Sequence, residues 1–384
     1  MTIFNTHTHA FKLDHVPDHF YSKLSIRNLK RWGILHWLMR TLHKAGVFPN
    51  GAVLDRLAQM LGIIDKKSQE DIFGILQSFY PDDTRFVILS MDMEHMGAGN
   101  PAVSYFHQLE ELAELKSRFR EKVYPFVCAD PRNPRVTETV KHYISERGFA
   151  GIKLYPALGY YPFDIRLHDI YRFALEKNLP IIVHCSKGPV YYRGDYTPEM
   201  LVHPVTGERY TEKGNSELSW HYSDPANYQY LMDKKWLQKY MDKVAPGTLA
   251  PDFSQLKISM GHFGGDKEIS KFLSSGWDFS ANKPLADNNN WFSTIRDLVK
   301  KFDHFYADVS YTWEDPSFNN ILKIILEESR EGDQKLYNRV LFGTDYFLVS
   351  METSEKQFAI NLRASLGEIT FHQISSVNPR RFLH

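Results

Sequence analysis

The sequence lacks a net charge, since its 384 residues carry 46 basic and 46 acidic side chains. A chain without a basic excess gives no reason to expect nucleic acid or an anionic membrane as a partner. It also contains only 2 cysteines, Cys128 and Cys185, which lie in apolar runs and have no partner at a metal-type spacing. This scarcity argues against a disulfide framework and is compatible with a reducing cytosol.

Long apolar stretches and low-complexity tracts are missing as well. No apolar run is long enough to span a bilayer, and residues 1–7 predict a strand rather than a secretory signal. The sequence does have material for a core, because 43% of its residues are hydrophobic and 14% are aromatic. We therefore predict a soluble cytoplasmic protein that binds a small-molecule substrate, without nucleic acid or membrane as partner; a homo-oligomer is left open.

Short apolar runs alternate with amphipathic segments, which is the pattern of repeated β–α units around a parallel sheet. Near-continuous apolar runs such as Ile181–Val183 are typical of strands that are buried on both faces. Eight such runs favour closure, so the predicted fold is α/β, a (β/α)8 TIM-type barrel. The predicted strands are Thr2–Asn5, Phe86–Asp92, Val123–Cys128, Gly151–Tyr155, Pro180–His184, Leu256–Met260, Phe305–Val309 and Val340–Phe342, and helices are predicted at Val136–Arg147, Leu167–Lys177 and Trp291–Phe302.

Two predicted connections are far longer than the usual few residues. The first spans residues 11–85 and contains Trp32, Trp37 and Met39 among Leu and Ile at helical spacing. We expect it to form a helical insertion over the barrel mouth. The whole chain, 1–384, is expected to be one barrel domain that carries such insertions after strands 1 and 5.

The second long connection spans residues 187–252 and is expected to form a lid-like insertion. It contains a predicted helix start, with Asp224 as the N-cap and Pro225 at the first helical position. Both insertions follow the carboxyl ends of strands, which is the face where barrel enzymes hold their chemistry.

Histidine and aspartate residues gather at the ends of the predicted strands. His7 and His9 end the first strand two residues apart, so both side chains point to one side. His184 ends the fifth strand, and His262 and Asp345 follow the sixth and the eighth. Each alone is explained by a core histidine or a helix-capping aspartate, but four strand ends that repeat the placement indicate a shared centre. Imidazole nitrogen with carboxylate oxygen suits zinc and related divalent ions, so these five residues are the predicted metal ligands.

Lys153 shares its strand face with Tyr155 and is expected to point into the barrel. A lysine in that position is costly unless it is paired or modified. Three interpretations stay open. A carbamylated Lys153 could bridge two metals, and an unmodified one could bind a substrate carboxylate or oxyanion. In the third interpretation it forms an ion pair with Asp345, Asp92 or Glu94.

Further polar residues are candidates for substrate contacts. They are Asp92, Glu94, Tyr155, Lys187, Arg193, His221 and Tyr222. Asp92 and Glu94 end the second strand and could instead orient histidine ligands or lie in a solvated loop. The last four lie in the long fifth connection, where a surface role is the simpler explanation for each.

The strand-end motifs resemble those of the amidohydrolase superfamily, in particular its amidohydrolase-related (type 2) branch. They occur in the family's order and span nearly the whole chain. The motifs are Asn5-Thr-His-Thr-His-Ala, Gly148-Phe-Ala-Gly-Ile-Lys-Leu-Tyr-Pro, Pro180-Ile-Ile-Val-His-Cys-Ser, Gly261-His-Phe-Gly-Gly, Phe342-Gly-Thr-Asp-Tyr and Val377-Asn-Pro-Arg-Arg-Phe.

The resemblance implies a distorted eight-stranded barrel in which Asp345 is metal ligand and general base. The histidines at the strand ends are then ligands or substrate-polarising groups. Type 2 members often hold one zinc or manganese ion, and zinc is our expectation. The run Lys153-Leu-Tyr-Pro-Ala is also similar to the dihydroorotase segment that supplies a carbamylated lysine, so a second ion stays open.

The activity that follows from the resemblance is metal-dependent hydrolysis of a C–N or C–O bond in a small amide, ester or lactone. A bound divalent cation lowers the pKa of a coordinated water from about 15.7 toward about 7. Asp345 would take up a proton and return it to the leaving group. His262 or His184 would polarise the carbonyl oxygen, and Lys153 is the third catalytic candidate.

Two alternatives use the same residues. Some relatives are non-oxidative decarboxylases of aromatic or enol acids, in which a proton replaces carbon dioxide. The second alternative is a metal-stabilised binding protein without catalysis, in which the protein ligands would close the coordination shell. Fold-level resemblance does not choose among these reactions.

Overall fold

Eight parallel strands form one sheet with the order β1-β2-β3-β4-β5-β6-β9-β10. The computed structural model describes residues 2–20, 60, 62–188, 190–274, 277–278, 283–284 and 290–384. The strands are β1 Phe4–Thr8, β2 Arg85–Leu89, β3 Val123–Cys128, β4 Gly151–Leu154, β5 Pro180–Val183, β6 Lys257–Met260, β9 Phe305–Asp308 and β10 Val340–Leu341, and a separate hairpin pairs β7 Trp277–Asp278 with β8 Lys283–Pro284. The eight strands of the sheet are the eight predicted runs, with ends that differ by up to three residues, so the predicted TIM-type barrel is confirmed.

The barrel closes where the segment after β10 lies against β1. The backbone nitrogen of Thr6 donates to the carbonyl oxygen of Phe342 at 2.9 Å, and that of Asp345 donates to His7 at 2.8 Å. The first strand therefore lies beside the segment that follows the last strand, and the predicted ligands of the first and eighth strands become neighbours.

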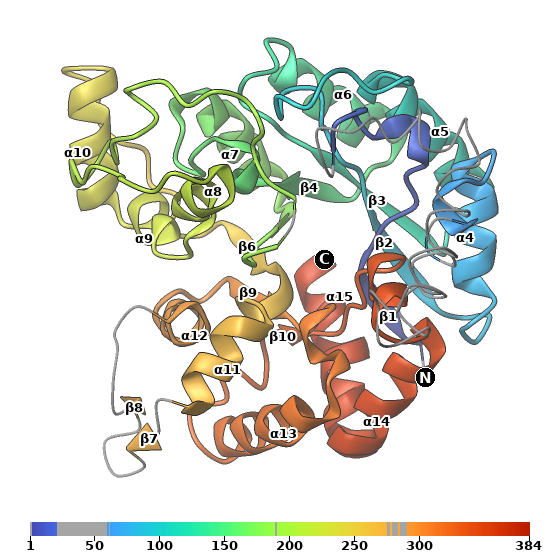
Figure 1. The fold of residues 1–384 in the computed structure, drawn as a ribbon. Coiled ribbons are helices and arrows are strands. Elements are labelled where there is room, and N and C mark those ends of the chain that lie inside the picture. The colour runs from blue at the N-terminus through green and yellow to red at the C-terminus, as the bar shows by residue number, and fades with distance from the viewer. Residues whose placement is uncertain are drawn as a thin grey trace, which may run out of the picture.

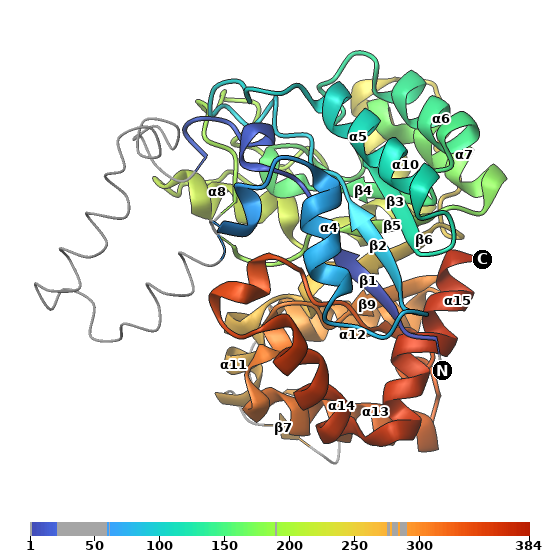
Figure 2. The same cartoon turned by 90° about the vertical axis from the view of Figure 1, so that its right-hand side faces the viewer.

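Helices cover the outside of this barrel. Figure 2 shows α4 to α7 on the outer side of the strands, and Figure 1 shows α13 and α14 side by side at the bottom of the view. The three predicted helices coincide with α6, α7 and α12 to within one residue. The helices are α4 Gln69–Gln77, α5 Tyr105–Arg118, α6 Val136–Arg147, α7 His168–Lys177, α8 Asn215–Ser223, α9 Asn227–Met232, α10 Lys234–Val244, α11 Asp266–Ser274, α12 Trp291–Lys301, α13 Pro316–Glu331, α14 Glu355–His372 and α15 Asn378–Leu383.

The barrel interior is filled by alternate strand residues, as expected for strands that are buried on both faces. Phe126 and Ile182 belong to this inner cluster. Lys153 is the register neighbour of Ile182, so its side chain points into the barrel as predicted. A Cβ at Gly151 would lie 2.5 Å from the Phe126 ring, which explains why a glycine precedes Lys153 by two residues.

The segment 187–252 carries α8, α9 and α10, which lie together on one side of the barrel in Figure 1. The predicted helix start at Asp224 and Pro225 is wrong by two residues, because α9 begins at Asn227. Asp224 Oδ1 accepts the Ala226 backbone N–H at 2.8 Å and forms a tight turn instead. A lid role for this segment stays a prediction.

Much of the other long connection, 11–85, lies outside the described residues, and with it Trp32, Trp37 and Met39. Its described parts include a short 3-10 turn at Leu13–His15 and helix α4. Among the described helices, none combines the length and the apolar character needed to cross a bilayer.

Candidate metal centre

His7, His262 and Asp345 come together inside the carboxyl end of the barrel. Each offers one ligand atom, and these atoms lie within 4.8 Å of one another. His7 Nε2 is 3.7 Å from Asp345 Oδ1, and His262 Nδ1 is 4.0 Å from Asp345 Oδ2. Two ligands that are each about 2.1 Å from a single ion are roughly 3–4 Å apart, so small side-chain movements would let all three reach one cation.

The other two predicted ligands flank this group. His9 Nε2 lies 3.3 Å from Asp345 Oδ1. His184 Nδ1 lies 3.1 Å from His262 Nε2, and the His184 ring stacks on Tyr155 at 4.0 Å between centroids and 9° between planes. The structure thus places all five predicted ligands in one cluster; their role as metal ligands stays a prediction.

Hydrogen bonds on the far side of two rings fix which nitrogen faces the cluster. His7 Nδ1 lies 2.9 Å from a carboxylate oxygen of Asp308, and His9 Nδ1 lies 3.0 Å from the carbonyl oxygen of Leu89. Both partners are acceptors, so both Nδ1 atoms must donate, and in the neutral rings the Nε2 lone pairs point at Asp345. His7 Nε2 is buried without a hydrogen-bond partner. Lone pairs that converge on a carboxylate fit a shared divalent cation, and nitrogen with oxygen donors suits zinc or manganese.

Glycines beside the cluster allow its close packing. A Cβ at Gly261 would lie 2.9 Å from the His7 ring, and a Cβ at Gly343 would lie 2.6 Å from His7 Cβ. Two predicted ligands close to these glycines have the left-handed backbone conformation, with φ of 63° at His262 and 61° at Asp345. These conformations cost energy for residues other than glycine and are concentrated at functional sites.

Asp308 and Ser310 are members of the cluster that sequence reasoning missed. Asp308 Oδ1 accepts the His262 backbone N–H at 3.0 Å, and its other oxygen holds His7. Ser310 Oγ lies 3.0 Å from His262 Nδ1. Asp308 ends an apolar strand just as His184 does, so the same strand-end signal could have found it.

Burial and charge set the ionisation of these groups. Burial lowers the pKa of His262 to about 4 and that of His7 below its ordinary value, so both imidazoles are neutral near pH 7. Burial opposes ionisation of Asp345, but His262, His9 and His7 outweigh it and hold the pKa of this carboxyl far below its usual range. The cluster therefore has neutral nitrogen donors around an ionised carboxylate, which is the state that binds a metal.

Lys153 lies deep in the barrel with its Nζ buried and without a hydrogen bond. Burial lowers the pKa of Lys153 to about 8, although Asp345 and Asp308 favour its charged form. The carbamylated and the substrate-binding interpretations of Lys153 stay predictions. The ion-pair interpretation is wrong, because the ion pairs between described residues do not include one from Lys153 to Asp345, Asp92 or Glu94 within 4.0 Å.

The cluster opens onto a cavity of about 80 Å³, which we call the apolar cavity. Its base is made of His9, His184 and Asp345, with Tyr155 beside them. The rest of its described lining is apolar and comes from the segments after β1, β2, β5 and β10.

The other candidate substrate-binding residues lie elsewhere. Glu94 Oε1 accepts the Tyr105 backbone N–H at 2.8 Å at the start of α5, and Asp92 is buried beside it. Lys187 and His221 line a second, larger cavity of about 300 Å³ within the segment 187–252, which we call the polar cavity.

Two candidates lie outside both cavities. The Tyr222 hydroxyl donates to the Met200 carbonyl at 2.6 Å. The Arg193 backbone nitrogen donates to Met96 at 2.7 Å, and its guanidinium lies over Tyr191. In this structure neither residue lines the apolar cavity.

The motif order, the barrel and the strand-end cluster agree with a comparison against protein-family models, in which residues 77–384 match the family described as amidohydrolase. The chain belongs to the amidohydrolase family. No functionally curated protein matches the sequence.

Solved structures share the fold of this family member over its whole length. A 2,6-dihydroxybenzoate decarboxylase from Rhizobium is 12% identical with a TM-score of 0.54, covering 100% of this chain and 98% of that one. A 5-carboxyvanillate decarboxylase from Novosphingobium aromaticivorans, with bound manganese and a nitrobenzoic acid, is 14% identical with a TM-score of 0.52, covering 100% and 97%. A putative amidohydrolase from Staphylococcus aureus is 14% identical with a TM-score of 0.51, covering 100% and 99%. At these identities the likeness shows the fold.

Proposed function

We propose that this amidohydrolase-family protein is a metal-dependent, non-oxidative decarboxylase of a small aromatic acid. The observation that carries the proposal is that the cluster forms the base of a cavity whose other described lining, apart from Tyr155, is apolar. Two of the structures with the same fold are aromatic acid decarboxylases, one of them with manganese bound, which supports this reaction over hydrolysis.

The residues that would hold the metal are His7, His9, His184, His262 and Asp345. Among the described residues one such group of ligands is found, so we propose a single ion, either zinc or manganese. When bound, a divalent cation supplies the positive charge that holds a carboxylate oxygen of the substrate. Asp308 keeps the His7 ring in place through its 2.9 Å hydrogen bond, so it acts as a positioning residue.

In the proposed reaction the bond between the ring and its carboxylate breaks, carbon dioxide leaves, and one proton takes its place on the ring carbon. An apolar wall favours this change because it keeps water away from the reacting ring, and the neutral carbon dioxide that leaves needs no hydration. Asp345 is ionised and is the carboxylate among the described cavity-lining residues, so we assign to it the relay of a proton from water to the ring carbon, with the hydroxide left behind released to solvent.

Hydrolysis is the second candidate, and a separate observation favours it. The neighbouring histidines hold the pKa of Asp345 far below its usual range, so the carboxylate is ionised as a general base requires. Asp345 would then take a proton from water and return it to the leaving group rather than deliver it to a ring carbon.

Product analysis separates the two reactions. Manganese-loaded protein would be incubated with hydroxybenzoates, 2,6-dihydroxybenzoate included, while carbon dioxide is measured, and in parallel with aryl esters, anilides and lactones. Release of carbon dioxide that disappears in Asp345→Asn is the expected result. Hydrolysis without carbon dioxide release would reject the decarboxylase and support the second candidate.

A further inference from the structure

The walls of the apolar cavity differ in chemistry from its base. At the base, His9, His184 and Asp345 offer polar atoms to a ligand. Phe11 lies beside this base, with its ring centroid 5.4 Å from that of His9, and Leu13 and Val16 from the same segment after β1 line the cavity as well. A ligand that places its carboxylate at the base must therefore place the opposite part of its ring against hydrocarbon.

The wall from the segment after β1 is held by contacts outside the cavity. The Val103 backbone nitrogen donates to the Asp14 carbonyl at 2.9 Å, and Lys12 Nζ lies 2.6 Å from Glu111 Oε1. Within the lining itself, Phe11 packs edge-on against Phe347 at 5.0 Å between ring centroids. The wall is therefore already formed, and its side chains need no rearrangement to meet a ligand.

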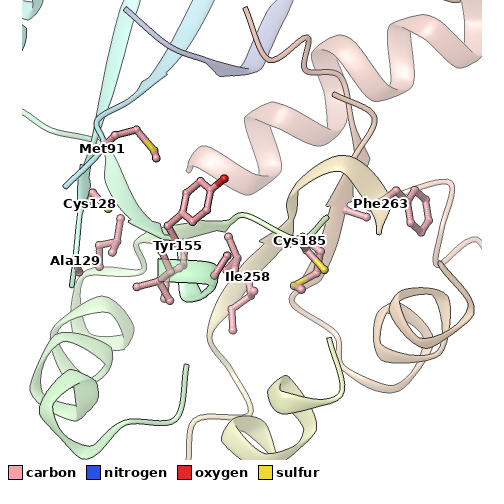
Figure 3. Packing of buried hydrophobic residues seen from close by; sticks show 14 of the residues in the cluster. Met91, Cys128, Ala129, Tyr155, Cys185, Ile258 and Phe263 are labelled. Atoms are coloured by element: carbon pink, nitrogen blue, oxygen red, sulfur yellow. The ribbon is translucent and has the colours of Figure 1, made fainter. Parts of the chain in front are cut away.

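The other sides come from strand ends across the barrel. Figure 3 shows Met91 and Tyr155 projecting from different strand ends, and both line the cavity. Leu348 follows the Asp345 segment and is the half-buried residue at the rim. Apart from Tyr155, which stacks on His184 beside the base, this lining is apolar, so a polar or charged substituent against Met91 or Leu348 would lose its water without gaining a hydrogen bond.

Resting on the proposed function, we infer that the substrate is a monocarboxylic aromatic acid with an apolar substituent opposite its carboxylate. Val16 and Leu348 select that substituent. Val16 is specificity-determining through contact with hydrocarbon, and Leu348 controls the rim where a charged group would have to sit.

Ligand binding tests this without requiring turnover. Manganese-loaded protein would be titrated calorimetrically with 4-methylbenzoate and with terephthalate, which carries a second carboxylate at the same position. The expected result is at least tenfold tighter binding of 4-methylbenzoate. Equal affinity, preference for terephthalate, or binding of neither acid would overturn the inference.

A charge placed at the rim sharpens the test. Leu348→Lys can keep its ammonium in water, and it should tighten terephthalate at least tenfold while weakening 4-methylbenzoate. Ile369→Lys on α14, a residue that is 71% exposed, is the matched control and should leave the ratio unchanged. An unchanged ratio in folded Leu348→Lys would contradict the role of the rim; the ratio in the unaltered protein decides the inference even where that variant does not fold.

The two proposals can fail separately. A preference for 4-methylbenzoate without carbon dioxide release from any hydroxybenzoate would reject the decarboxylase and keep the apolar selection. Carbon dioxide release with a preference for aromatic dicarboxylates would do the reverse.

Discussion

The apolar cavity and the polar cavity differ in how their polar groups are satisfied. The polar cavity is larger, and two of its charged groups have ion-pair partners: Lys187 Nζ lies 2.7 Å from Glu268, and His221 Nε2 lies 2.8 Å from Glu212. In the cluster beneath the apolar cavity, His7 Nε2 is buried without a partner. A buried potential metal-ligand atom without a hydrogen-bond partner therefore identifies the site better than cavity size does.

The variant that should distinguish the two cavities most clearly is Asp345→Asn at the base of the apolar cavity. The change removes the carboxylate that we assign to proton transfer, so turnover should fall by about a thousandfold or more, while the four histidines retain some metal. Steady-state rates and metal content measured on the same preparation check both parts. Full activity in this variant would remove Asp345 from the reaction.

Asp308→Asn should have the next largest effect. The amide keeps an oxygen for the His262 backbone N–H but loses the charge that orients His7. Loss of such a partner typically weakens metal affinity by about 10- to 100-fold. A manganese titration against a competing chelator measures this, and an unaltered affinity would show that Asp308 does not hold His7 for the metal.

A pH experiment tests the network behind the base of the apolar cavity. Glu355 accepts hydrogen bonds from Tyr80 and Thr344, and burial raises the pKa of Glu355 to about 7. The folded state therefore binds this proton more tightly than the unfolded state. The proton contributes roughly 3 kcal/mol to the free energy of unfolding below about pH 4.5, and this contribution is lost as the pH rises through 7.

Glu355→Gln replaces the titrating carboxyl by an amide that does not ionise. The fall in melting temperature between pH 5 and pH 8 should therefore be smaller in this variant than in the unaltered protein. Glu331→Gln on the exposed end of α13 is the matched control and should behave like the unaltered protein. An equal fall in melting temperature between pH 5 and pH 8 in all three proteins would contradict the raised pKa of Glu355.

The smallest effect on activity is expected in the polar cavity. Lys187→Met breaks the pair with Glu268, whose side chain is buried, so the free energy of unfolding should fall by about 1–3 kcal/mol. Turnover should change by no more than about twofold, because Lys187 does not line the apolar cavity. A much larger loss of kcat/KM with little loss of stability would move the substrate site to the polar cavity.

Strand periodicity predicted the barrel because strands that are buried on both faces leave near-continuous apolar runs. Position at strand ends predicted the cluster, since parallel strands aim those residues at one centre. His7, His9, His184, His262 and Asp345 are accordingly found together. Asp308 obeys the same rule, because it ends β9, the seventh strand of the barrel.

Other features depend on tertiary contacts that a single sequence does not contain. The ring of Tyr155 faces the cluster by stacking on His184, and no local pattern specifies that contact. Lys187 and His221 both lie in the long connection after β5 and His184, yet they line the polar cavity, His221 from within α8. Loop conformation decides such cases, and spacing along the chain does not.

The most direct test of the account is to locate the ion. Anomalous diffraction from crystals of the manganese-loaded protein should show one peak between His7, His262 and Asp345, at about 2.0–2.3 Å from their ligand atoms. A protein that takes up manganese elsewhere, or that shows no peak within reach of these three side chains, would contradict the claim that this cluster is a metal centre.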